Sequence, residues 1–116
     1  MKLEIQNIWS ADLPSLDGYP ENIYDFQVGI QLSIGEVGKP GGEVFYLTVI
    51  SPNALSRIEP GIFLDNTLII DEFDWDVIRR RITKLFSFCQ NATDWKEVIL
   101  RLAGCLRYSD GEIWNL

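Results

Sequence analysis

The sequence has no histidine, only two cysteines and no long run of apolar residues. Histidine is the commonest general base and metal ligand, so its absence excludes Ser-His-Asp and Cys-His catalysis within this chain. A zinc site would need both thiols together with carboxylates, which is an unfavourable ligand set. The longest apolar run has about four residues, whereas a membrane-spanning helix needs roughly 20. We therefore expect no metal, no cofactor and no membrane association.

The length and composition bound the fold class. A chain of 116 residues, 47% of them hydrophobic, is too apolar to remain disordered, and its length is that of one domain, residues 1–116. The N-terminus, Met1 to Glu4, has no basic flank followed by an apolar region, so the sequence predicts no secretory signal. We expect a cytoplasmic protein.

Basic residues are scarce in the first two thirds of the chain. Residues 1–78 hold three bases and thirteen acids, whereas residues 79–116 hold seven bases and four acids, and the net charge is −7. An anionic surface repels nucleic acid, because binding to phosphate depends on cations. The same surface attracts basic proteins, although negative charge also serves solubility alone. Both of these interpretations stay open, and nucleic acid is disfavoured as a partner.

Alternating apolar residues predict strands in the first two thirds. Residues 2–6 form a short alternating run, and residues 26–34 form the clearest strand. The apolar face of that strand consists of Phe26, Val28, Ile30, Leu32 and Ile34. Residues 43–51 are rich in β-branched and aromatic side chains, as a central strand is, and the glycine-rich segment 35–42 joins the two strands as a hairpin.

Two further elements follow the hairpin. Ser51 and Pro52 are the residue types that cap and begin a short helical turn. Residues 62–70 predict a fourth strand, interrupted at Asp65 and Asn66.

The apolar spacing becomes helical from Trp75 onward. We expect Asp74 to cap a first helix that continues to Cys89, and Thr93 to cap a second helix that continues to about Ser109. The connection is short, so the two helices are predicted to be antiparallel neighbours. Strands followed by helices indicate an α+β fold, an antiparallel sheet of about four strands followed by two antiparallel helices packed on one face.

Four acids lie within six residues where the last strand meets the first helix. They are Asp71, Glu72, Asp74 and Asp76. Close carboxylates repel one another, and the helix dipole offsets part of this repulsion for Asp74 and Asp76. The cluster is interpreted either as a helix cap with a solvated strand end or as a patch that binds Lys or Arg of a partner. A calcium-binding EF loop is disfavoured, because Asp76 and Ile82 stand where that loop has Gly and Glu.

The loop of residues 11–25 combines carboxylates with tyrosines, which is the composition of many protein interfaces. Long loops are also more often functional than short ones, and an ordinary surface loop is the alternative. The candidate partner-binding residues of this loop are Asp17, Tyr19, Glu21, Tyr24 and Asp25.

We expect several other residues to have structural roles. Residues 79–81 are three arginines, which we expect on a solvated helix face, paired with Asp76. Cys89 and Cys105 are predicted to be reduced thiols on the buried faces or flanks of the two helices. Trp9 and Trp114 would be interface candidates if they are exposed.

Several segments carry a family resemblance that spans nearly the whole chain. They are residues 1–5, Tyr24-Asp25-Phe26, residues 41–45, the Ser51-Pro52 turn, residues 68–75 and residues 94–98. Together they resemble immunity protein family 8 of bacterial polymorphic-toxin and contact-dependent growth-inhibition systems. The resemblance implies a single immunity-type domain that has no enzymatic activity and that binds and occludes a cognate toxin domain.

The resemblance also implies the chemistry of the partner. Such toxins are often nucleases with basic clefts, where an anionic protein competes with phosphate for the same cations. We expect a monomer or weak homodimer that binds a basic toxin domain. An acidic adaptor or secretion chaperone is one alternative. A metal-dependent hydrolase using Asp65, Asp71 or Asp74 as ligands of a divalent ion is another.

Overall fold

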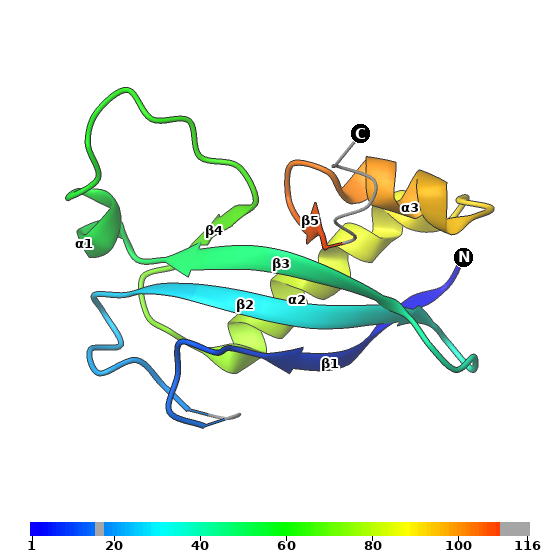
Figure 1. The fold of residues 1–116 in the computed structure, drawn as a ribbon, viewed down its shortest axis with the longest axis horizontal. Helices are drawn as coiled ribbons and strands as arrows, with labels where there is room; N and C mark the ends of the chain where they lie inside the picture. Colours follow the sequence, from blue (N-terminus) through cyan, green and yellow to red (C-terminus); the bar gives the residue numbers. More distant parts are fainter. Residues whose placement is uncertain (16–17, 110–116) are drawn as a thin grey trace.

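A computed structural model describes residues 1–15 and 18–109 of the chain. Within these residues, strands come first and the longer helices later (Figure 1). The elements are β1 (Leu3–Trp9), β2 (Gln27–Glu36), β3 (Glu43–Ile50), α1 (Pro52–Leu55), β4 (Thr67–Ile69), α2 (Trp75–Leu85), the 3-10 helix η1 (Phe86–Cys89), α3 (Trp95–Leu102) and β5 (Arg107–Tyr108). This arrangement confirms the predicted α+β class.

The sheet is built around the hairpin of β2 and β3. The strand order is β1-β2-β3-β4, and β1, β2 and β3 pair antiparallel. One edge of β3 is shared, because β4 pairs with residues 48–50 and β5 pairs with Phe45 and Tyr46. The hairpin and the turn after it confirm the sequence prediction, since the Ser51 side chain caps α1 and Pro52 occupies its first position.

The fourth strand differs from the prediction in length and direction. Only Thr67–Ile69 is a strand, and it pairs parallel to β3, whereas residues 62–70 were expected to form an antiparallel strand. The chain from β3 returns through α1 and a long loop, so it enters β4 in the direction of β3. Residues 62–66 would have to pair with the upstream part of β3, and β5 already occupies that edge at Phe45 and Tyr46.

The second long helix is shorter than expected. It ends at Leu102, and Gly104 has a positive φ of 93°, which favours glycine and turns the chain away from the helix axis. Leu106 is still buried, but in the turn before β5 and not on a helix. The N-cap is Asp94 in place of Thr93, because the Asp94 carboxylate accepts a hydrogen bond from the Glu97 amide at 2.9 Å.

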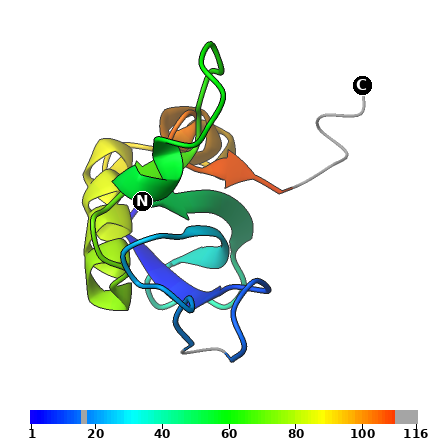
Figure 2. The ribbon, with the colours of Figure 1, turned by 90° about the vertical axis from the view of Figure 1, so that its left-hand side faces the viewer.

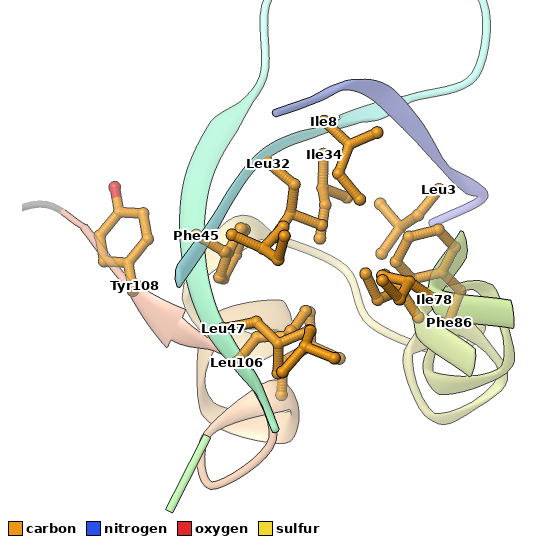
Figure 3. Packing of buried hydrophobic residues seen from close by; sticks show 14 of the residues in the cluster. Leu3, Ile8, Leu32, Ile34, Phe45, Leu47, Ile78, Phe86, Leu106 and Tyr108 are labelled. Carbon is orange, nitrogen blue, oxygen red and sulfur yellow. The ribbon is translucent and has the colours of Figure 1, made fainter. Parts of the chain in front are cut away.

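The core lies between one face of the sheet and the helices. The alternating apolar side chains from Phe26, directly before β2, to Ile34 are all 4% exposed or less, as the sequence pattern predicts. Figure 2 shows the long helix α2 alongside the sheet. In Figure 3, side chains of the strands, such as Ile34, point toward Ile78 and Phe86 of the helical layer. Burial of each such side chain contributes about 1.5–3 kcal/mol.

The beginning of the chain is attached to the helical layer. The Met1 ammonium donates hydrogen bonds to the carbonyl oxygens of Gln90 at 3.0 Å and Ala92 at 2.9 Å. Trp9, at the other end of β1, is half-buried. No helix in residues 1–15 and 18–109 is long and apolar enough to cross a membrane.

Candidate functional site

The strand–helix junction is shaped by Phe73 and Asp74. The Phe73 side chain is buried in the core. The next residue, Asp74, has an extended backbone conformation and is the N-cap of α2. One carboxylate oxygen of Asp74 accepts hydrogen bonds from the amides of Asp76 at 2.8 Å and Val77 at 3.3 Å. Asp74 is therefore occupied as a helix cap. Asp71, Glu72 and Asp76 remain exposed around it.

The loop of residues 11–25 packs against this junction. The Phe73 amide donates a hydrogen bond to the Ile23 carbonyl at 2.8 Å. The Phe73 ring makes edge-to-face contacts with Tyr19, Phe26 and Trp75, with ring centroids 5.8, 5.3 and 5.3 Å apart. Aromatic pairs in this geometry contribute about 0.5–1.5 kcal/mol each beyond their buried area. Phe73 thus fixes the position of the loop relative to Glu72 and Asp74, the acids on either side of Phe73 in the sequence.

Two side-chain hydrogen bonds complete the contact between loop and junction. The Trp75 indole donates to the Gly18 carbonyl at 2.9 Å, and the Tyr24 hydroxyl donates to the Glu72 carboxylate at 3.2 Å. The hydrogen bond to Glu72 and the charge of that carboxylate raise the pKa of Tyr24. The loop of residues 11–25 and the acidic cluster of residues 71–76, which are separate in the sequence, therefore contact each other and form one surface. We call it the acidic surface and define it as Tyr19, Glu21, Tyr24, Asp71, Glu72 and Asp76.

Two other predicted residues are not part of the acidic surface. Asp25 is held by Arg57 in a two-pronged ion pair, with nitrogen–oxygen distances of 2.6 and 2.9 Å. The hydrogen bonds from the Arg57 guanidinium lower the pKa of Asp25. Asp25 thus ties the loop to the segment after α1 and is not a free acid. Asp17, like Trp114, lies outside the described residues.

The acidic surface is open and shallow. A hollow of about 340 Å³ is lined by Ile69, Asp71, Glu72, Asp74 and their neighbours. A second open hollow, of about 770 Å³, follows the loop from Asp12 to Val28. Small-molecule sites usually enclose most of their ligand, which these hollows do not. In residues 1–15 and 18–109, no group of three or more acidic or thiol side chains converges as metal ligands would.

This end of the molecule also exposes large apolar side chains, most of which the sequence analysis missed. Nine large apolar side chains of the described chain are exposed, and six of them lie at this end: Tyr19, Tyr24, Ile62, Phe63, Leu64 and Ile69. The sequence predicts a strand over the run from Ile62 to Leu64, whereas in the structure this run is a loop. The signal that identifies it as a loop is its position between two pairs of turn-forming residues, Pro60-Gly61 and Asp65-Asn66.

The remaining sequence candidates are structural. Residues 79–81 are exposed on α2, but the expected ion pair with the Asp76 carboxylate is absent from the described chain, and the Arg80 guanidinium donates to the Asp76 backbone carbonyl at 3.4 Å. Cys89 is buried, as predicted, and its burial raises the pKa of the thiol. Cys105 is a free thiol as predicted, but its predicted burial is wrong, since α3 ends before it and it is exposed in the following turn.

Comparison with known proteins adds a family to this geometry. A family model described as immunity protein 8 matches residues 3–109, from the first residue of β1 to the residue after β5. No curated protein matches the chain, and no solved structure does.

Proposed function

The chain belongs to the immunity protein 8 family, and we propose that it neutralises a cognate toxin by covering the toxin's basic site with the acidic surface. Membership of the family implies toxin neutralisation in general. The acidic surface is the part of this chain that best suits a basic partner. A nuclease is the toxin class that we propose, because its cleft binds phosphates through Lys and Arg.

One observation carries this proposal, namely the charge at this end of the molecule. The segments 18–26, 52–57 and 69–77 meet there and contain six acids but only one base, Arg57. That base is already paired with Asp25, so the remaining carboxylates have no cation in these segments. Such a field attracts a basic partner over a distance and accelerates encounter. The exposed rings of Tyr19 and Tyr24, 53% and 55% accessible, supply contact area.

The proposed mechanism is steric and electrostatic, and it requires no catalysis by this chain. A standard protein interface buries about 800 Å² on each partner, and covering a basic cleft with such an area excludes its substrate. The aromatic contacts of Phe73 hold the surface in place before binding, which reduces the entropy lost on association. We therefore propose one-to-one inhibition without turnover.

The test uses the product of the gene immediately upstream of this protein's gene as the candidate toxin. Cells that express both proteins should survive, the two proteins should co-purify, and one equivalent of this protein should abolish toxin activity in vitro. Affinity should fall as salt concentration rises, because exposed charges are screened. Tight binding without loss of toxin activity would indicate an adaptor or chaperone instead. Inactivation by far less than one equivalent would indicate an enzyme.

A further inference from the structure

The loop between α1 and β4, residues 58–66, exposes three consecutive apolar side chains. Phe63 is 100% exposed, and Ile62 and Leu64 are 53% and 47% exposed. A folded domain gains stability by burying such side chains, so a run of three left in water is typical of a site that another molecule covers. The loop is therefore a candidate contact surface in its own right.

The fold holds this loop at its two ends and leaves its middle projecting. On the α1 side, the Ile58 amide donates to the Leu55 carbonyl at 3.1 Å. On the β4 side, the Asn66 amide donates to the Gly104 carbonyl at 2.8 Å. Figure 1 shows the loop extending away from the sheet between α1 and β4. Anchored ends reduce the conformational entropy that the loop loses when a partner covers it.

The loop belongs to the same end of the molecule as the acidic surface. Arg57, directly before the loop, binds the Asp25 carboxylate, and the Asn53 amide nitrogen in α1 donates to the Tyr24 carbonyl at 2.9 Å. Figure 1 places the loop, α1 and the segment of residues 18–26 at the same left-hand end of the sheet, with the loop above the sheet and the segment below it; Figure 2 shows the loop projecting upward from this end. A single partner that covers this end would meet both features.

The charges around the loop indicate what kind of partner covers it. Glu59 and Asp65 flank the apolar run, and both are exposed. An anionic membrane surface would repel these carboxylates, whereas Lys or Arg side chains on a protein would attract them. A second copy of this chain would bring another acidic end against the first. The charges thus favour a basic protein with an apolar pocket among its cations.

We propose that Phe63 inserts into an apolar pocket of the cognate toxin, next to the cations that the acidic surface binds. The inference rests on the proposed function and adds an anchor residue to it. Interfaces typically depend on a few aromatic side chains that become fully buried at their centre. Ile62 and Leu64 would line the edge of the same contact and exclude water from it.

The test compares Phe63→Ala with Phe88→Ala in the 116-residue chain, titrated against the toxin domain that the survival and co-purification experiments identify. Phe88, in η1, is also exposed, at 63%, and lies away from the acidic surface, so it is a matched control. We expect Phe63→Ala to weaken binding by about 30-fold, the size of an interface hot spot. Phe88→Ala should bind as the unchanged protein does. Circular dichroism should show both variants folded, because neither ring is buried.

A crosslinking experiment reads the contact directly. A photoreactive phenylalanine analogue at position 63 should crosslink to the toxin domain, and the same analogue at position 88 should not. Equal affinity of Phe63→Ala and the unchanged protein would overturn the inference and leave the proposed function intact. Failure of the unchanged protein to bind the toxin would overturn both. Binding to vesicles of anionic phospholipid that Phe63→Asp abolishes would assign the loop to a membrane, against this inference.

Discussion

Several charged groups at the hairpin end of the sheet have partners, whereas most charges at the acidic end, the end that carries the acidic surface, do not. The hairpin end comprises the β2–β3 turn, the N-terminus and η1. There Lys39 pairs with Glu36 at 2.9 Å, and the Met1 ammonium binds backbone carbonyls. At the acidic end of the described chain, Arg57–Asp25 is the one ion pair. An exposed carboxylate without an internal partner costs little in water and stays available to another protein.

The two ends also differ in how aromatic rings are used. At the hairpin end, Phe86 of η1 is buried in the core as an ordinary packing residue. At the acidic end, Phe73 is buried as well, but its ring contacts Tyr19, which is half exposed, and it holds a loop in place. Burial at the acidic end therefore positions a surface as well as stabilising the fold. The following variants test this difference.

The largest expected effect is that of Phe73→Ala. Removing this buried ring should lower the free energy of unfolding by about 3–5 kcal/mol, through lost burial and a cavity. Phe86→Ala should cost a similar amount, measured by urea denaturation of both variants. Only Phe73→Ala should also weaken toxin binding by the protein that remains folded, because only it releases the loop. Equal toxin affinity of the two variants would show that the loop does not need this support.

The next largest effect is expected from reversing charge at the acidic end. Asp71→Lys with Glu72→Lys should weaken toxin binding by about 100-fold, mainly through slower association, because both side chains would face the cations of the partner. The control is Glu4→Lys with Glu36→Lys, which changes net charge equally at the hairpin end. Asp74 is left unchanged because it caps α2. Calorimetry and thermal unfolding of both double variants separate binding from stability, and equal losses of affinity would contradict the assignment.

The smallest effect concerns the one ion pair of the acidic end. Arg57 lowers the pKa of Asp25, so the pair stabilises the fold above about pH 4, and that contribution is lost as pH falls through the lowered pKa. Arg57→Gln should return the pKa of Asp25 to its ordinary range and slightly lower stability at neutral pH. Carboxyl NMR titration measures the shift. Arg57→Lys keeps the positive charge without the two-pronged geometry, so it should restore part of the lowering of the Asp25 pKa.

The elements that local chemistry specifies were predictable. Alternation from Phe26 to Ile34 predicted β2, and the pair Ser51-Pro52 predicted α1 with its cap. Asp74 was recognised as the cap of α2, because short acidic side chains satisfy free amides at a helix start. These predictions succeeded because each depends on residues within about one turn or one strand of each other.

The end of α3 was not predictable in the same way. The apolar spacing continues from Trp95 to Leu106, as if the helix did. Gly104 turns the chain, and Tyr108 then pairs with Phe45 of β3, more than sixty residues earlier. Leu106 would be buried on a continued helix, and it is buried in the observed turn before β5. The hydrophobic pattern therefore does not distinguish a helix from a turn at this position.

For the candidate site, the sequence by itself determined its chemistry: an excess of carboxylates in residues 1–78 and tyrosines among them. Only the tertiary structure decided which of these groups act together. It joined the Tyr24 hydroxyl to Glu72 and Asp25 to Arg57, and it left Phe63 fully exposed in the loop between α1 and β4. The physical reason is that charge and polarity are properties of each residue, whereas the availability of a side chain for binding a partner depends on contacts between segments distant in the chain.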